Sequence, residues 1–363
     1  HMSSPTRTTS TGAPRCHELA VHQARRSFGK LQFALRPDLP AVASVTDVPI
    51  PGVHARDGVI MARLYRPLDA AQDAILPVTF YFHGGGWCVG DIPSYDALCR
   101  ELANLGGCAV LSVDYRLAPE HPFPGAVEDA LQAVAWTLAN AAMLGVDPTR
   151  FALAGDSAGG TLSAVTALQM RNDGAPQAAH QILIYPCTDI LSQRPSRRTY
   201  ANGYFLDTES LAWFFEKYLP NQSDWSDWRA SPLLAGRFDR LPPATFIVAG
   251  CDPLTDDCKA YAEALGTAGV PVTVHEFDGM LHGFITLFAG SPINAVAVLI
   301  DSATTVPPGV SFSLPTQSTP KDIGDLAPGE GFSFWVRRSV QADAIATATD
   351  GLKIKLAGDR FLS

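Results

Sequence analysis

The stretch Phe151-Ala152-Leu153-Ala154-Gly155-Asp156-Ser157-Ala158-Gly159 decides the fold class of this 363-residue chain. Its apolar start predicts a buried strand, and the Gly-x-Ser-x-Gly pattern then leads into a helical run up to Asn172. A tight strand-to-helix turn strains the serine backbone, so small neighbours are needed to avoid clashes. The helix after Ser157 would offer free backbone N–H groups and the positive end of its dipole. By itself the pentapeptide leaves open a glycine-rich turn with an incidental serine.

Short apolar segments recur on both sides of this stretch and alternate with helical patterns. This alternation is typical of a mainly parallel central sheet flanked by helices. The near-continuous apolar character of the segments suits strands that are covered on both faces. We predict strands at residues 45–50, 58–65, 77–82, 109–113, 151–154, 181–185, 244–249 and 272–277. We predict helices at residues 96–105, 124–141, 159–172 and 257–265.

Composition divides the chain into a central α/β domain, residues 15–302, and two flanking parts. Residues 1–14 are predicted to form a flexible N-terminal tail, and a helical pattern over 16–35 follows it. Residues 191–228 interrupt the strand–helix rhythm and predict an inserted helical element over one end of the sheet. Residues 303–363 carry apolar runs between proline- and glycine-rich links, which predicts a small β-rich C-terminal appendage.

The overall composition excludes several classes of protein. With 27 Lys and Arg against 36 Asp and Glu, the net charge of -9 argues against a nucleic-acid surface. No apolar run approaches the roughly 20 residues of a membrane helix, and no signal peptide is visible. Seven scattered cysteines favour a reducing compartment over disulfides. We therefore expect a soluble cytoplasmic protein without nucleic-acid or membrane partners.

A second glycine-rich motif, His83-Gly84-Gly85-Gly86-Trp87, directly follows the predicted strand at 77–82. Three glycines allow the backbone to approach a ligand closely, and their N–H groups can point at a developing oxyanion. A merely flexible loop is the alternative. The position of this motif upstream of the Gly-x-Ser-x-Gly turn favours an oxyanion loop.

A serine nucleophile needs a histidine base, and three histidines follow Ser157 along the chain. His282 comes after the last predicted strand, at the sheet edge where ligands bind in open α/β sheets, and is our choice. His275 lies within that strand, and His180 precedes a strand at the opposite end of the sheet. We expect both to be structural.

The acid that holds the histidine is predicted to be Asp252, which directly follows the strand at 244–249. Asp256 and Asp257 compete for this role, but they lie at a predicted helix start and have an N-cap explanation. Asp278 is close to His282 in sequence, yet with Gly279 it is expected to shape a turn.

Metal and cofactor chemistry finds no support in the sequence. His17 and His22 resemble part of a zinc signature, but a spacing of five rather than four residues takes them off a common helical face. No phosphate-binding loop or dinucleotide fingerprint occurs. We expect neither a metal nor a cofactor.

In combination these motifs resemble the bacterial hormone-sensitive-lipase family of esterases, which has the α/β-hydrolase fold. The resemblance covers about residues 15–290 and rests on five motifs: 83–87, 114–124, 155–160, 252–254 and 282–284. It implies Ser157, Asp252 and His282 as the catalytic triad. It further implies an oxyanion hole made by the N–H groups of Gly85, Gly86 and Ala158, and a helical cap from residues 15–44 and 191–228.

The chain departs from the family pattern at both ends. The N-terminal cap segment is shorter than usual, which could leave the binding pocket more open. The closing C-terminal helix is reduced to residues 293–302, and the β-rich appendage after it is foreign to the family. The choice between a monomer and a homo-oligomer therefore stays open.

The predicted function is hydrolysis of short- to medium-chain esters of small molecules. Side chains of limited apolar extent are expected to line the pocket: Trp87, Tyr185, Phe205, Leu206, Phe214 and Phe284. For the aromatics of the inserted element, ordinary core packing is an equal alternative. An amidase or deacetylase that uses the same site, and a non-catalytic small-molecule receptor, remain as rival functions.

Overall fold

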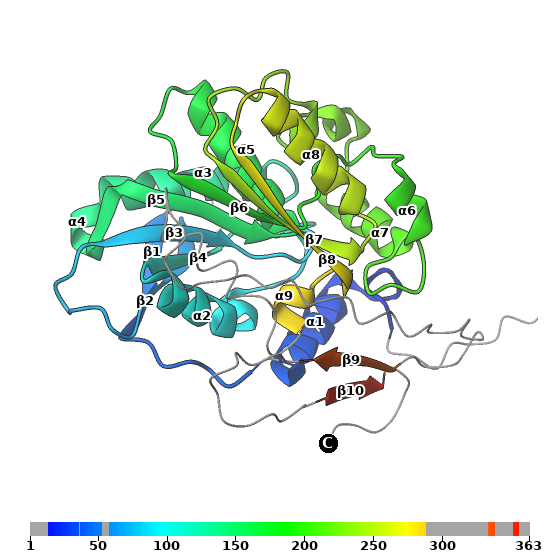
Figure 1. The fold of residues 1–363 in the computed structure, drawn as a ribbon, viewed down its shortest axis with the longest axis horizontal. Helices are drawn as coiled ribbons and strands as arrows, with labels where there is room; N and C mark the ends of the chain where they lie inside the picture. Colours follow the sequence, from blue (N-terminus) through cyan, green and yellow to red (C-terminus); the bar gives the residue numbers. More distant parts are fainter. Residues whose placement is uncertain (1–13, 36, 53–57, 288–332, 338–350, 356–363) are drawn as a thin grey trace, which may run out of the picture.

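An eight-stranded sheet runs through the centre of the molecule in the order β1-β2-β4-β3-β5-β6-β7-β8 (Figure 1). The structure is a computed structural model, and it describes residues 14–35, 37–52, 58–287, 333–337 and 351–355. Strands β4, β3, β5, β6, β7 and β8 are mutually parallel, whereas β2 pairs antiparallel with both β4 and β1. The strands are β1 (Ser44–Pro51), β2 (Val59–Arg66), β3 (Leu76–Phe82), β4 (Ala109–Asp114), β5 (Val146–Asp156), β6 (His180–Ile184), β7 (Ala244–Cys251) and β8 (Val272–Leu281).

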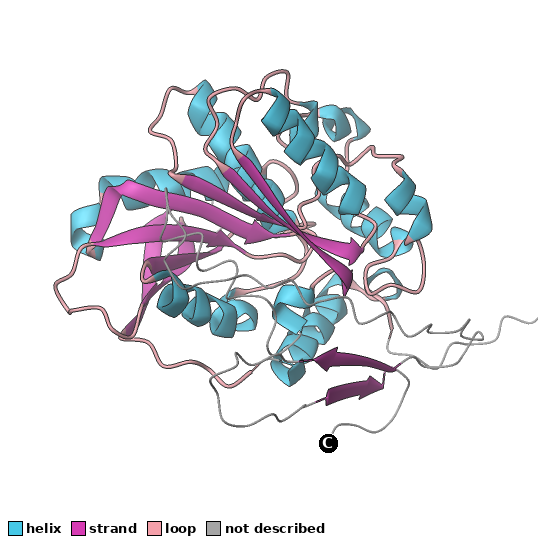
Figure 2. Cartoon of the chain, viewed as in Figure 1, coloured by secondary structure: helices cyan, strands magenta, loops and turns pink. Residues whose placement is uncertain are grey.

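Helices cover both faces of this sheet (Figure 2). Helix α2 lies on one face, and α3, α5 and α8 lie on the other (Figure 1). The larger helices are α1 (Val21–Leu35), α2 (Asp96–Gly106), α3 (Gly125–Ala139), α5 (Ala158–Asn172), α7 (Thr208–Tyr218) and α8 (Thr255–Thr267). The short helical turns are η1 (Cys16–Glu18), η2 (Ile92–Tyr95), α4 (Ala141–Leu144), α6 (Pro195–Thr199), η3 (Gln222–Ser226), η4 (Pro232–Leu234) and α9 (Phe284–Leu287).

The predicted α/β fold is confirmed, since all eight predicted strands are present. Phe80, Leu111 and Leu153 on the central strands are fully buried, which explains why these strands lack the alternation of a half-exposed sheet. The predicted helix at 124–141 is instead two helices, because α3 ends at Ala139 and α4 begins at Ala141.

Strand β8 is longer than predicted and continues through Asp278-Gly279, where a turn was expected. The strand runs on to Leu281, and its pairing with β7 shifts register between Ala249 and Cys251. Gly279 has a positive φ of 76° inside this irregular part. The turn chemistry of the dipeptide therefore produces a bulge within the strand rather than a strand end.

The C-terminal appendage is described only in part. Strands β9 (Ser333–Arg337) and β10 (Gly351–Lys355) pair antiparallel, close to the predicted apolar runs. The rest of residues 303–363, the predicted helix at 293–302 and the tail at 1–13 lie outside the described residues. Within the described part of the chain, no helix has both the length and the apolar character needed to cross a bilayer.

Candidate active site

Ser157 lies in the tight turn between β5 and α5. Its backbone has φ 54° and ψ -118°, a strained conformation for a residue with a side chain. Its N–H group donates to the carbonyl oxygen of Ile184 at 2.8 Å, which ties the turn to β6. A Cβ atom on Gly159 would overlap the carbonyl oxygen of Phe82, so only glycine allows α5 to begin this close to β3. The turn therefore has the geometry of a nucleophile elbow.

His282 connects Ser157 to Asp252 in a continuous hydrogen-bonded row. Its Nε2 atom lies 2.9 Å from the Ser157 hydroxyl oxygen, and its Nδ1 atom lies 2.6 Å from Oδ2 of Asp252. Because the carboxylate can only accept, Nδ1 carries the proton and Nε2 is free to accept from the serine hydroxyl. Asp252 is fully buried and its other oxygen accepts from the N–H of Leu254 at 2.9 Å. The structure thus brings the three predicted side chains together at the carboxyl ends of β5, β7 and β8.

The competing histidines and acids lie elsewhere. His180 hydrogen-bonds to Thr245 at 2.9 Å at the start of β6, and His275 is half-buried within β8. The expected N-cap role of Asp256 and Asp257 is wrong, because Leu254 occupies the N-cap position of α8. Both carboxylates instead bind residues of α6: Asp256 accepts from the Ser196 N–H at 2.8 Å, and Asp257 accepts from the Arg197 guanidinium at 2.6 Å.

Two peptide groups of the glycine-rich loop are held in a fixed orientation. Nδ1 of His83 donates to the carbonyl oxygen of Gly84 at 2.8 Å. The N–H groups of Cys88 and Val89 both donate to the carbonyl oxygen of Gly85 at 3.0 Å. In a trans peptide the C=O and N–H bonds point in opposite directions, so the Gly85 and Gly86 amides face away from these donors. Among the described residues, neither amide has a hydrogen-bond partner, and both are available to a ligand.

Asp156 holds this loop through a hydrogen bond to the Gly84 N–H, a role that the sequence analysis missed. Its Oδ1 atom accepts from the Gly84 N–H at 2.8 Å and from the Tyr81 hydroxyl at 2.9 Å. Its Oδ2 atom accepts from the Tyr95 hydroxyl at 3.1 Å. Burial raises the pKa of Asp156 to about 6. The signal in the sequence was a charged residue inside an otherwise apolar elbow.

His83 is fully buried, and its ring stacks on Tyr115 with a centroid distance of 4.3 Å. Burial lowers the pKa of His83 to about 4, so the ring is neutral near pH 7. A neutral ring carries one proton, and the contact with the Gly84 carbonyl places that proton on Nδ1. The motif histidine is therefore a support for the loop.

The predicted pocket-lining residues differ in what their side chains contact and in how far they are buried. Tyr185 and Phe214 lie next to the reacting groups. The ring centroids of Tyr185 and His282 are 4.5 Å apart, and a Cβ atom on Gly86 would overlap the Phe214 ring. The Phe284 ring packs against Tyr185, with ring centroids 5.7 Å apart. Trp87 is buried and stacks on Tyr218, with ring centroids 4.4 Å apart. Phe205 is exposed and Leu206 is buried.

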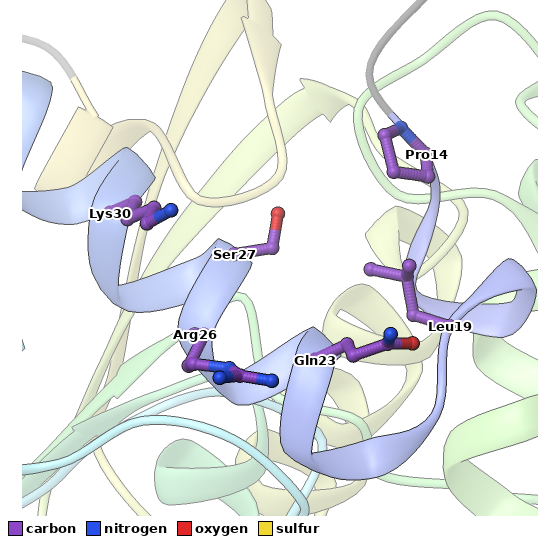
Figure 3. A pocket seen from close by; sticks show the side chains of 6 residues that line it. All are labelled: Pro14, Leu19, Gln23, Arg26, Ser27 and Lys30. Atoms are coloured by element: carbon purple, nitrogen blue, oxygen red, sulfur yellow. The ribbon is translucent and has the colours of Figure 1, made fainter.

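A hollow of about 300 Å³ lies at the start of α1 and the segment before it (Figure 3). All of its lining residues come from the N-terminal segment: Pro14, Leu19, Gln23, Arg26, Ser27 and Lys30. Since none of them belongs to a loop that carries the hydrogen-bonded row, we do not place the substrate there. Over the described ranges, no group of three or more metal-ligating side chains occurs either.

The sheet order, the elbow and the Ser-His-Asp row define the class of α/β hydrolases. Comparisons with known proteins agree, because a family described as "alpha/beta hydrolase fold" matches residues 79–286. Carboxylic ester hydrolase LipN of Mycobacterium tuberculosis is 44% identical over 250 residues, 67% of this chain and 65% of LipN. The match thus spans just under two thirds of that relative. Ethyl acetate hydrolase of Pseudomonas putida is 38% identical over 275 residues, 75% of this chain and 85% of that enzyme.

Solved structures show the same similarity. An α/β hydrolase from the metagenome of Lake Arreo, Spain, has a TM-score of 0.76 and 40% identity, covering 80% of this chain and 92% of that chain. The esterase of Pyrobaculum calidifontis has a TM-score of 0.73 and 40% identity, covering 78% of this chain and 93% of that chain. The chain belongs to the hormone-sensitive-lipase family of α/β-hydrolase carboxylesterases.

Proposed function

We propose that this chain hydrolyses carboxylic esters with short to medium acyl chains through an acyl-enzyme intermediate on Ser157. The observation that carries the proposal is the continuous row from Ser157 through His282 to Asp252. Beside it, the Gly85 and Gly86 amides are oriented and unpaired within the described part of the chain. Ala158 is the first residue of α5, so its amide lacks a helical partner and completes the oxyanion hole.

In the first half of the reaction, the Ser157 oxygen attacks the ester carbonyl and His282 Nε2 takes the hydroxyl proton. Asp252 holds the ring in the required tautomer and stabilises the imidazolium. The three amides bind the oxyanion of the tetrahedral intermediate, each lowering the barrier by about 3–4 kcal/mol. The intermediate then expels the alcohol, which takes the proton from His282. Water attacks the acyl group by the same steps in reverse and regenerates the serine.

The acyl range is inferred from the rings next to the reacting groups and from a relative. Tyr185 and Phe214 bring bulk close to His282 and Gly86, which favours small acyl groups. The relative from Pseudomonas putida is named for ethyl acetate, a short ester. The cytoplasmic location and the choice between monomer and homo-oligomer remain predictions from sequence.

The test is initial rates on p-nitrophenyl acetate, butyrate, octanoate and palmitate, with wild type beside Ser157→Ala. We expect the highest kcat/KM between acetate and octanoate, and loss of turnover by at least about 1000-fold in Ser157→Ala. Faster hydrolysis of palmitate than of butyrate would contradict the acyl range. A matched ester and anilide pair separates esterase from amidase, and binding without turnover in folded wild type would indicate a receptor.

A further inference from the structure

Arg25 reaches from helix α1 to the outer side of the glycine-rich loop. Its Nε atom donates to the carbonyl oxygen of Cys88 at 2.8 Å, and Nη2 donates to the carbonyl oxygen of Ala118 at 3.0 Å. The same guanidinium forms a two-pronged ion pair with Glu120, with distances of 2.8 and 2.6 Å. Three separate acceptors therefore fix the position of this cation.

The Cys88 carbonyl is the start of a hydrogen-bonded chain that ends at the oxyanion hole. The Cys88 carbonyl and the Val89 N–H belong to one peptide group, and that N–H donates to the Gly85 carbonyl at 3.0 Å. The Gly85 carbonyl and the Gly86 N–H belong to a second peptide group, which is the next link of the hydrogen-bonded chain. Because C=O and N–H are opposed in a trans peptide, the direction of donation continues from Arg25 to the Gly86 amide.

Hydrogen bonds that are linked in this way polarise one another, and a cationic donor at the start gives the largest effect. We propose that Arg25 is a positioning residue for the oxyanion hole, acting through the Cys88–Val89 and Gly85–Gly86 peptide groups. It orients the Gly86 amide and strengthens it as a donor to the developing negative charge. This inference rests on the proposed function, since it assigns a task within the same reaction.

A second side chain of helix α1, Gln32, fixes the helix to the segment after His282 and so helps to position Arg25. Gln32 lies seven residues further along, so both side chains project from the same face of the helix. Gln32 is buried, and its Nε2 atom donates to the Thr286 hydroxyl at 3.1 Å, which in turn donates to the Gly283 carbonyl at 3.2 Å. Helix α1 thus contacts α9, just after His282, as well as the oxyanion loop (Figure 1).

The experiment compares Arg25→Gln, Arg25→Lys and Arg26→Gln. Arg26 is the neighbouring, exposed arginine on α1, so its variant removes the same charge without touching the loop. With p-nitrophenyl butyrate we expect Arg25→Gln to lower kcat about tenfold, a fraction of the loss from deleting an oxyanion donor, with KM within twofold. Affinity for an alkyl boronic acid, which forms a tetrahedral adduct on serine, should fall by the same factor. Arg25→Lys should recover part of both losses, and Arg26→Gln should match wild type.

Two outcomes of the kinetic experiment would overturn the inference. One is a kcat of Arg25→Gln within twofold of wild type. The other is an equal loss in Arg25→Lys and Arg25→Gln that follows a fall in thermal midpoint, since this would mean that Arg25 only fastens the helix.

A readout without turnover separates this inference from the proposed function. If Ser157→Ala kept wild-type turnover, the proposed function would fail, whatever the role of Arg25. Amide hydrogen exchange of the peptide covering residues 83–90 would still report on the hydrogen-bonded chain. Arg25→Gln should speed exchange at Val89 and Arg26→Gln should not; unchanged exchange in Arg25→Gln rejects the inference.

Discussion

The residue next to the nucleophile is a buried carboxylate, which is an expensive group to place in a protein core. Asp156 is 3% exposed and satisfies its two oxygens with one backbone amide and two tyrosine hydroxyls. These three donors come from β3, the glycine-rich loop and η2, so the carboxylate joins the elbow to the oxyanion loop. The unfavourable burial of this carboxylate therefore accompanies the fixed position of the elbow relative to the oxyanion loop.

The cost should be measurable as a pH dependence of stability. Burial raises the pKa of folded Asp156 to about 6, above its ordinary value of 3.8. The folded state therefore keeps this proton in a pH range where the unfolded state has lost it, and stability falls as pH rises from about 4 to 6. Relative to Asp156→Asn, the wild-type free energy of unfolding should drop by on the order of 3 kcal/mol across this window.

Urea unfolding of both proteins at pH 4, 5, 6 and 7.5 gives this difference directly. The difference should level off above pH 6, where Asp156 is ionised in both states. A difference that stays constant from pH 4 to 7.5, or one that grows in favour of wild type, would show that burial does not raise this pKa.

At the scale of elements, helices α1 and α6 each contact a segment next to a catalytic residue. Helix α1 binds the oxyanion loop through Arg25 and the segment after His282 through Gln32. Helix α6 binds the segment after Asp252, since Ser196 donates to the Pro253 carbonyl at 2.8 Å. The cap from residues 15–44 and 191–228, which the family resemblance implies, stays a prediction.

Helix α6 is also attached to α8 by a buried ion pair between Arg197 and Asp257. Their closest atoms are 2.6 Å apart, and Asp257 is fully buried. Arg197→Gln removes the nearer of two cations that pair with Asp257, the other being Arg194 at 3.9 Å. It should lower the free energy of unfolding by about 3–5 kcal/mol in chemical denaturation. Arg237→Gln is the matched control, because its pair with Asp239 is solvent-exposed and should contribute little to stability. Similar losses in both variants would contradict this assignment.

Elements and site differ in how far the sequence predicts them. Short apolar segments that alternate with helical patterns were enough to predict the eight strands, and the two glycine-rich motifs predicted the elbow and the oxyanion loop. The positions of Asp252 and His282 just after predicted strands were enough to choose them as partners of Ser157. The role of Asp257 was missed because its partner Arg197 lies 60 residues away in a different element. The extension of β8 was missed because a bulge and a turn use the same Asp-Gly chemistry.

Pocket side chains were the hardest to predict, because an aromatic residue near a motif can face a ligand or the core. Trp87 belongs to the oxyanion motif, yet its ring is buried against Tyr218. Tyr185 lies just after β6, and its ring contacts His282. Which way such a ring turns depends on the packing of distant helices, which a local pattern does not contain.

For the whole molecule, the seven free thiols provide a test of the packing. Burial raises the pKa of Cys88 to about 12 and that of Cys16 to about 11, so both stay protonated at pH 8. Only Cys16 and Cys251 are partly exposed. In native protein, Ellman's reagent should therefore react with at most two thiols over minutes, and with seven in denaturant. Rapid reaction of five or more native thiols would contradict the described core.

The central claim is that Ser157 is the nucleophile of an esterase whose base is His282. The most direct measurement is reaction with a p-nitrophenyl alkylphosphonate, followed by peptide mapping of the adduct. We predict release of one p-nitrophenol per chain, a label on the peptide that contains Ser157, and a rate at least about 1000-fold lower in His282→Ala. A label on another residue, or an unchanged rate in His282→Ala, would contradict the account.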